Sequence, residues 1–273
     1  MKKIGTFFLI IFFFVSCSSV PITGRKRVNF VSDSEVLPTS FAHYKDFLEE
    51  NTLSKNKIMT RQVKDVGKNI STAVDVFMRA NKMISEADSY EWEFNLIDDD
   101  KVNAWCMPGG KVVFYTGIIP ICLNEDGIAA VMGHEFARAF AKHVQERMSQ
   151  SKLQQLSREA LALGTSKKSE TAKQIWNTTF GIGTGLGMLK FSRVHEQEAD
   201  RLGLIFMLMA GYDGAEAAHV WSRMSSLSEG KSSPEILSTH PSNSSRIEDL
   251  KNYLPTAKKM ATQFMKKANT FIN

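Results

Sequence analysis

The segment from residue 130 to residue 143, Ala-Val-Met-Gly-His-Glu-Phe-Ala-Arg-Ala-Phe-Ala-Lys-His, places His134 and Glu135 in an otherwise apolar helical pattern. In the sequence His-Glu-x-x-His, two histidines four residues apart lie roughly 40° apart on one helix face and can bind one zinc ion. The glutamate between them then acts as general base. Here Arg138 stands where the second histidine belongs. The segment therefore predicts a buried helix that carries most of a zinc site, together with one residue that interrupts it.

A second apolar helix is predicted from about residue 191 to residue 210, and it carries Glu196 and Asp200. Four residues apart, these carboxylates lie on one helix face beside apolar positions such as Leu204. Carboxylates inside an apolar helix require a metal ion or a cationic partner. Glu196 can complete a His/His/Glu zinc set, and Asp200 can orient the imidazole of a ligand.

Helical spacing of apolar residues also covers residues 32–85 and the region from residue 211 to the C-terminus. The central helix is predicted from residue 127 to about residue 148, with Asn124 or Asp126 as its cap. The chain is therefore expected to be mainly helical.

Three short segments between these helices read as strands. Residues 90–98 alternate between apolar and polar side chains, which is the period of a strand. Residues 103–107 and 111–117 are two extended segments joined by a Pro-Gly-Gly turn. The sequence thus favours an α+β fold, mainly α, with a small sheet.

The N-terminus has the organisation of a bacterial lipoprotein signal. Lys2 and Lys3 precede an uncharged apolar stretch, residues 4–15, which is shorter than the roughly 20 residues that a membrane-spanning helix needs. Phe-Val-Ser-Cys17 resembles a lipobox, although Phe14 stands where leucine is usual, and it predicts acylation of Cys17. An ordinary signal peptide with an incidental cysteine is the alternative.

The expected organisation is a signal peptide at residues 1–16, a lipid-anchored tether at residues 17–31 and one peptidase domain at residues 32–273. Pro21 and Gly24 predict that the tether has no regular structure. Serine directly after the cysteine, rather than aspartate, predicts sorting to the outer membrane.

Composition excludes some functions. The formal net charge of +5 includes Lys2 and Lys3, and no basic-aromatic pattern accompanies it, so no nucleic-acid partner is expected.

Cys106 and Cys122 are expected to be free, buried thiols, although a bridge between them stays possible. The alternating glycines of residues 181–187 favour close helix packing or a flap, since no strand precedes them as a nucleotide loop requires.

Taken together, these motifs resemble a known family, the HtpX-like and BepA-like zinc metalloendopeptidases, or minigluzincins, and most closely its short LoiP-like lipoprotein members. The resemblance covers nearly all of the chain after the N-terminal signal. The motifs that carry it are Pro21-Ile-Thr-Gly-Arg25, Asn103-Ala104 with Pro108-Gly109-Gly110, His134-Glu135, Ser192-Arg193, Glu196-Gln-Glu-Ala-Asp200, and Thr239-His240-Pro241 with Arg246.

The resemblance implies a gluzincin-like zincin fold with a small sheet beside the active-site helix and one Zn²⁺ per chain. It makes His134 and Glu196 zinc ligands and Glu135 the general base and acid. It places His240 and Arg246 at the cleft, on the scissile carbonyl or as an extra ligand; capping before a proline is the alternative role of His240. By contrast, His143 lies about 180° around an ideal helix from His134, so packing is its expected role.

The same resemblance implies an extended peptide as substrate, paired with an edge strand near residues 103–107 or 112–116. It also implies an envelope protease of misfolded or unassembled membrane proteins, anchored in the bacterial outer membrane and facing the periplasm.

Arg138 leaves three outcomes open, because arginine stays protonated and cannot bind zinc. Its guanidinium fills the zinc position and pairs with Glu196 and with Glu135 or Asp200, which leaves an inactive peptidase. Alternatively, Arg138 turns outward and His240 becomes the third ligand of a weakly bound zinc. In the third case, Arg138 is a recent or engineered change in a working enzyme. From a different functional class, the chain could be an inactive, lipid-anchored peptide-binding or assembly module.

Overall fold

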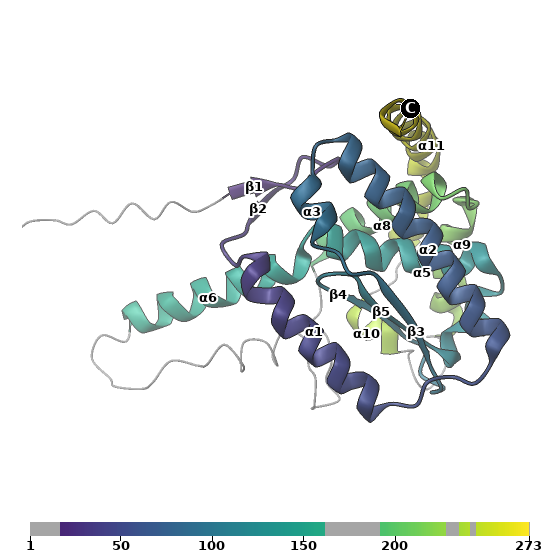
Figure 1. The fold of residues 1–273 in the computed structure, drawn as a ribbon, viewed down its shortest axis with the longest axis horizontal. Helices are drawn as coiled ribbons and strands as arrows, with labels where there is room; N and C mark the ends of the chain where they lie inside the picture. The colour runs from purple at the N-terminus through teal and green to yellow at the C-terminus, as the bar shows by residue number, and fades with distance from the viewer. Residues whose placement is uncertain (1–16, 162–191, 228–234, 241–243, 273) are drawn as a thin grey trace, which may run out of the picture.

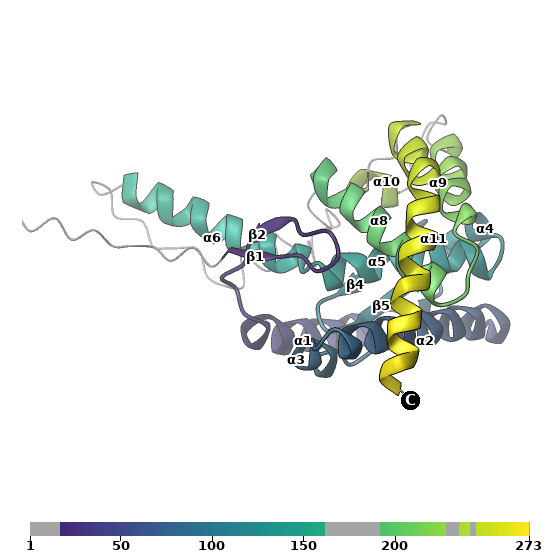
Figure 2. The same ribbon diagram turned by 90° about the horizontal axis from the view of Figure 1, so that it is seen from above.

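The computed structural model describes residues 17–161, 192–227, 235–240 and 244–272. Helices surround a three-stranded sheet, and a short N-terminal hairpin precedes them (Figures 1 and 2). The predicted α+β, mainly α class with a small sheet is confirmed. The expected signal peptide, residues 1–16, and the glycine-rich segment, residues 181–187, lie outside the described residues.

The sheet consists of β3 (Glu93–Ile97), β4 (Ala104–Met107) and β5 (Lys111–Tyr115) in the order β3-β5-β4. β5 runs parallel to β3 and antiparallel to β4. Because β5 pairs on both sides, the alternative that residues 112–116 form an edge strand is wrong. The predicted edge strand at residues 103–107 corresponds to β4.

Both faces of the sheet are covered. One face of the sheet packs against α1 (Asp33–Glu50), where Trp105 meets Phe47 edge-to-face at 4.9 Å between ring centroids. The other face points into the main core, packs against α2 (Lys57–Ala80) and contains Cys106. Cys106 and Cys122 are buried and unbridged, as predicted.

The central helix α5 (Glu125–Phe140) begins two residues before the predicted start, directly after one of the two predicted caps. Its cap is Asn124, whose Oδ1 accepts a hydrogen bond from the backbone N–H of Gly127 at 2.9 Å. The helix ends eight residues earlier than predicted, because Lys142 adopts φ +54° and α6 (His143–Leu161) starts a new helix. Arg27 donates a hydrogen bond to the Ala141 carbonyl at 2.5 Å and thereby satisfies the helix end.

Helix α8 (Arg193–Met209) crosses α5 at very close range. The two backbones approach at Gly133 and Gly203: a Cβ on Gly203 would lie 2.7 Å from the Gly133 carbonyl carbon and 2.7 Å from the His134 nitrogen. Only glycine fits at this crossing, which brings the acidic start of α8 beside His134.

The remaining helices complete the molecule. The long α11 (Ser244–Ile272) packs on α8 and on α9 (Ala215–Leu227), which itself packs on α5, and α10 (Glu235–Thr239) leads into His240 (Figure 2). The short helices α3 (Ile84–Asp88) and α4 (Ile119–Cys122) fill connections.

The N-terminal tether contains regular structure, contrary to the prediction. β1 (Cys17–Ser19) pairs antiparallel with β2 (Lys26–Val28). Pro21 and Gly24 form the turn between the strands, in which the Gly24 N–H donates to the Val20 carbonyl at 2.9 Å. These two residues therefore make the hairpin possible instead of preventing it.

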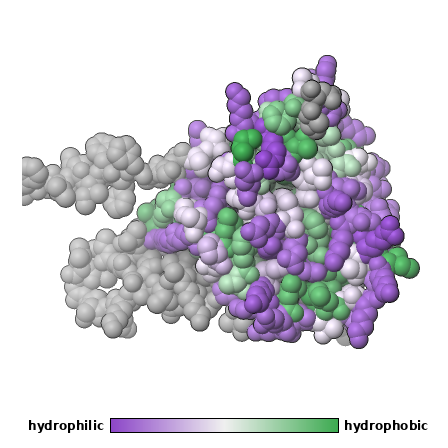
Figure 3. All heavy atoms as spheres, in the orientation of Figure 1, coloured by the Kyte–Doolittle hydropathy of each residue, from purple (hydrophilic) through white to green (hydrophobic). Residues whose placement is uncertain are grey.

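The outer surface is largely polar. The face shown in Figure 3 is mostly hydrophilic, with hydrophobic side chains in small groups. Among the described helices, none combines the length and apolar character that crossing a bilayer requires.

Candidate metal centre

Three buried side chains converge between α5, α8 and the end of α10. The Nε2 atom of His134 lies 3.1 Å from Nδ1 of His240 and 3.6 Å from Oε2 of Glu196, and the latter two atoms are 2.9 Å apart. Ligand atoms around a tetrahedral zinc ion with bonds of 2.0–2.1 Å are separated by about 3.3 Å. Within the described part of the chain, no other group of histidines, cysteines and acids is arranged in this way. Both the donor set and its spacing fit one zinc ion.

Asp200 orients His134 from behind. Its Oδ1 accepts a hydrogen bond from Nδ1 of His134 at 2.9 Å, which leaves the Nε2 lone pair directed at the other two candidate ligands. Burial lowers the pKa of His134 to about 4 despite this carboxylate, so the ring is neutral. Burial opposes ionisation of Asp200, but the charge and hydrogen bonds of Arg246 outweigh it and lower the Asp200 pKa to about 2.

Arg246 connects two acids of α8, Asp200 and Glu196. Its Nε and Nη2 atoms donate to the two Asp200 oxygens at 2.5 and 2.7 Å, and Nη1 lies 3.2 Å from Oε2 of Glu196. Its guanidinium stacks on Trp221 at 3.8 Å from the ring centroid. Among the described residues, Oε1 of Glu196 has no hydrogen-bond partner, although it is buried. An unsatisfied buried carboxylate oxygen is what a site shaped for a cation would contain.

Arg138 points into the site and is only 4% exposed. Its Nη1 atom lies 3.1 Å from Oε2 of Glu135 and 2.7 Å from Nε2 of His240. The guanidinium thus pairs with Glu135, as one alternative expected, while Glu196 contacts Arg246 and His240. The other alternative is right that His240 joins the ligand group and wrong that Arg138 turns outward.

The contact with Arg138 determines which nitrogen of His240 carries the proton. Arginine can only donate, so Nε2 of His240 accepts and the proton of the neutral ring sits on Nδ1. The ring is neutral because burial, and then the charges of Arg138 and Arg246, lower its pKa well below the usual value. The Nδ1–H donates towards Glu196 at 2.9 Å. A proton therefore lies between the three side chains, where a cation would bind.

Glu135 is buried beside this group, and burial raises its pKa to about 7. The charge of Arg138 and a backbone hydrogen bond from Cys106, on the edge strand β4, oppose that increase. Near neutral pH the carboxylate is therefore poised between its two protonation states, which suits a general base.

Some residues of interest lie outside this group. His143 is the first residue of α6 and pairs with Glu198 at 2.9 Å, so it takes no part among the candidate ligands. The sequence did not predict the position of Trp221, whose ring centroid lies 5.3 Å from that of His134. It is one aromatic residue in a helix that carries no motif, so nothing in the sequence indicates that it lies beside the candidate ligands.

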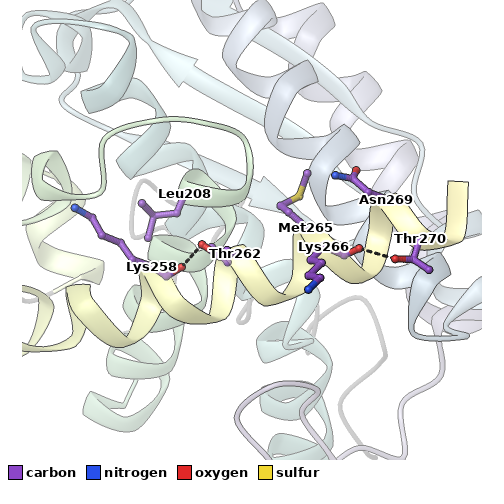
Figure 4. Close-up of a pocket in the computed structure, with 8 residues that line it drawn as sticks. Leu208, Lys258, Thr262, Met265, Lys266, Asn269 and Thr270 are labelled. Atoms are coloured by element: carbon purple, nitrogen blue, oxygen red, sulfur yellow. Dashed lines mark hydrogen bonds between the residues drawn. The ribbon is translucent and has the colours of Figure 1, made fainter. Parts of the chain in front are cut away.

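A groove with a volume of about 800 Å³ lies elsewhere, along α11 (Figure 4). Its floor includes Leu208 and Met265, and its threonine hydroxyls, on Thr262 and Thr270, bond to carbonyls of their own helix. None of the residues discussed above lines it.

Comparisons with known proteins agree on one family. The profile of peptidase family M48 matches residues 65–254. The mitochondrial metalloendopeptidase OMA1 of Saccharomyces cerevisiae is 29% identical over 93% of this chain and 73% of its own length. OMA1 of Schizosaccharomyces pombe is 32% identical over 90% of this chain and 69% of its own length. The beta-barrel assembly-enhancing protease of Escherichia coli is 30% identical over 67% of this chain, which spans 39% of that protein.

These comparisons correct the predicted location. An outer-membrane position facing the periplasm was inferred from the residues around Cys17. The relatives from the two yeasts, which match nine-tenths of the chain, are mitochondrial proteins, and the bacterial relative matches only two-thirds of it. The prediction of the bacterial outer membrane is therefore wrong.

Proposed function

The chain belongs to peptidase family M48, whose members are zinc-dependent peptidases, and we propose that it is a metalloendopeptidase homologue with an altered zinc site. In this site, Arg138 keeps Nδ1 of His240 protonated and thereby opposes the binding of zinc. Its peptidase activity is then strongly reduced. The observation that carries this proposal is the 2.7 Å contact between Nη1 of Arg138 and Nε2 of His240, with Glu135 on the same guanidinium.

In this proposal His134, Glu196 and His240 would hold the zinc ion. When bound, zinc supplies Lewis-acid polarisation of the scissile carbonyl and lowers the pKa of water. Asp200 keeps the His134 proton on Nδ1, and Arg246 keeps Asp200 ionised. These two residues fix the orientation of the first ligand without touching the reacting atoms.

Glu135 would accept the proton of the attacking water and pass it to the leaving amine. Ion pairing with Arg138 keeps its carboxylate engaged, so the base is available only when that pair opens. Proton transfer also requires the ionised form, which predominates above the Glu135 pKa of about 7.

Arg138 opposes metal binding in two ways. It adds a buried positive charge next to the position of a dication. It also fixes the His240 proton on Nδ1; moving that proton to Nε2 would make an N–H face the guanidinium N–H. Zinc binding through His240 thus requires Arg138 to move away.

The substrate we propose is an extended segment of an unfolded or unassembled membrane protein. Among the described strands, none pairs with the outer edge of β4, which offers backbone groups for main-chain pairing next to Glu135, the acceptor of a backbone hydrogen bond from Cys106. We further propose that acyl chains on Cys17 anchor the chain to a membrane, which mass spectrometry of the native protein would detect as added acyl mass.

The test of the proposed function is cleavage of an unfolded protein substrate by the wild type and by the Arg138→His variant. We expect the variant to be chelator-sensitive and on the order of 100-fold more active, because it regains the His-Glu-x-x-His ligands. Glu135→Gln in the same background should abolish the activity, and Arg201→His, a surface change on α8, should leave the wild-type rate unchanged. Equal rates for wild type and Arg138→His would overturn the proposal.

A second function is favoured by the same hydrogen-bond network, in which Arg138, Glu135 and His240 contact one another without a metal: a module that binds peptides without cutting them. Peptide affinity that is equal with and without chelator, together with no cleavage, would support this function. Affinity that falls on removal of metal would exclude it.

A further inference from the structure

Arg25 connects the N-terminal hairpin to two helices of the molecule, α6 and α8. Arg25, at the end of the Pro21-Ile-Thr-Gly-Arg25 motif, donates from Nη1 and Nη2 to the two carboxylate oxygens of Glu146 at 3.0 and 2.7 Å. Its Nε donates to Oε2 of Glu198 at 2.8 Å. Thr23 of the same turn donates to the other Glu198 oxygen at 2.5 Å. The hairpin therefore joins α6 and α8 (Figure 2).

The two carboxylates that Arg25 binds are buried. Glu146 and Glu198 are 4% and 5% exposed, and their other partners are His195 at 3.2 Å and His143 at 2.9 Å. Burial lowers the pKa of His143 to about 4, so that ring is neutral near pH 7. Arg25 therefore supplies permanent positive charge to both acids, and charge neutralisation is what makes their burial tolerable.

The position of Glu198 connects this cluster to the candidate metal centre. Glu198 lies between Glu196 and Asp200 on α8, and two residues along a helix correspond to roughly 200° of rotation. Arg246 consequently binds Asp200 and Glu196 on one side of the first turns of α8, while Arg25 binds Glu198 on the opposite side.

We infer that Arg25 is a positioning residue for the metal centre and that residues 17–28 belong to the working unit of the enzyme. Arg25 fixes the start of α8 against α6, and this sets the place of Glu196 relative to His134. The inference rests on the proposed function only where zinc affinity is concerned.

The test compares Arg25→Ala with two matched arginine variants in the full chain. Arg27→Ala removes an arginine of the same hairpin that bonds to Ala141 and Ser18 but not to α8. Arg201→Ala removes a surface ion pair from α8 itself. A fourth variant, Arg25→Lys, keeps the charge but loses the planar fork of donors.

The first measurement is amide hydrogen exchange, which requires no zinc. Arg25→Ala should raise exchange at residues 196–200 at least tenfold more than at residues 202–209, Arg25→Lys should give a smaller increase, and neither control should show this local pattern. A uniform increase over the whole molecule, or none at residues 196–200, would overturn the inference.

The second measurement is zinc affinity in the Arg138→His background. Arg25→Ala should weaken it roughly 10–100-fold, as removal of supporting residues does at other metal sites, whereas Arg27→Ala should not. Unchanged affinity would also overturn the inference. If Arg138→His itself binds no zinc, the proposed function fails, and the exchange result alone decides the role of Arg25.

Discussion

In the candidate metal centre, the Nδ1 proton of His240 lies where the proposed peptidase function requires a zinc ion. His134, Glu196 and His240 have the spacing of zinc ligands, and Asp200 and Arg246 hold them in place. A single arginine, through its contact with His240, favours the protonated arrangement. In the proposed function, a zinc ion therefore has to displace the proton on Nδ1 of His240 before the site can act.

Asp200→Asn should destabilise the protein by about 3–5 kcal/mol, because it removes the charge of the buried carboxylate that accepts two hydrogen bonds from Arg246. Asp249→Asn is the matched control: it breaks the partly exposed pair with Arg201 and should lower the free energy of unfolding by at most about 1 kcal/mol. Urea unfolding measures both. Similar losses in the two variants would mean that the Asp200–Arg246 pair does not support the site.

The sequence was sufficient to predict that the two candidate ligands in helical motifs, His134 and Glu196, lie close together. Helical spacing predicted that Glu196 and Asp200 share a face, and the structure places them together beside His134. The contact of Arg138 with His240 was not predictable in the same way, since 102 residues separate the two and no periodicity relates them. Resemblance placed His240 at the cleft, on the scissile carbonyl or as an extra ligand, and gave no indication of its contact with Arg138.

At the level of the elements, the site depends on how closely α5 and α8 cross. Gly133 and Gly203 allow backbone-to-backbone contact immediately next to His134. The short distance between the helices permits a nitrogen of one and a carboxylate of the other to share a single ion. The helix patterns were predicted, but the glycine contact depends on the crossing itself.

Gly203→Ala should therefore destabilise the protein by more than about 2 kcal/mol, although alanine favours helices elsewhere, because its Cβ would meet backbone atoms at 2.7 Å. Gly67→Ala is the control, since the atoms nearest to its Cβ belong to a side chain, the Phe94 ring, and not to the backbone. Thermal unfolding compares the two. If Gly203→Ala were as stable as the wild type, the helices would not be held this tightly.

The ends of elements were harder to predict than their existence. The apolar pattern continues past Phe140, so the sequence predicted a helix to Met148. The structure breaks it at Lys142, where Arg27 from the distant hairpin binds the Ala141 carbonyl. Local periodicity contains no information about such a long-range contact, and the hairpin itself was taken for an irregular tether.

At the level of the whole molecule, an unusual number of ionisable groups is buried around α8. Arg25 and Arg246 stabilise acids on its two sides, and neutral histidines complete both clusters. Folding therefore depends on the protonation state of groups that an unfolded chain would titrate freely.

The protein should lose stability as the pH falls from 6.5 towards 4. Burial lowers the pKa of His143 to about 4 from about 6.5, so stability due to its neutral form is present above pH 6.5 and disappears as the pH falls through 4. The difference between these two pKa values corresponds to roughly 3 kcal/mol in the free energy of unfolding. Urea unfolding at pH 7.5 and pH 4.5 should show a smaller loss for His143→Gln than for the wild type, while His219→Gln, at an exposed histidine, should match the wild type. An identical loss in all three proteins would contradict this account.

The most direct test of the closed metal centre is the zinc affinity of the purified wild type and of Arg138→His, each titrated against a competing chelator. The account predicts that Arg138→His binds one zinc ion per chain and that the wild type binds it on the order of 100-fold more weakly or worse. One tightly bound zinc ion per wild-type chain, with the affinity of Arg138→His, would contradict it.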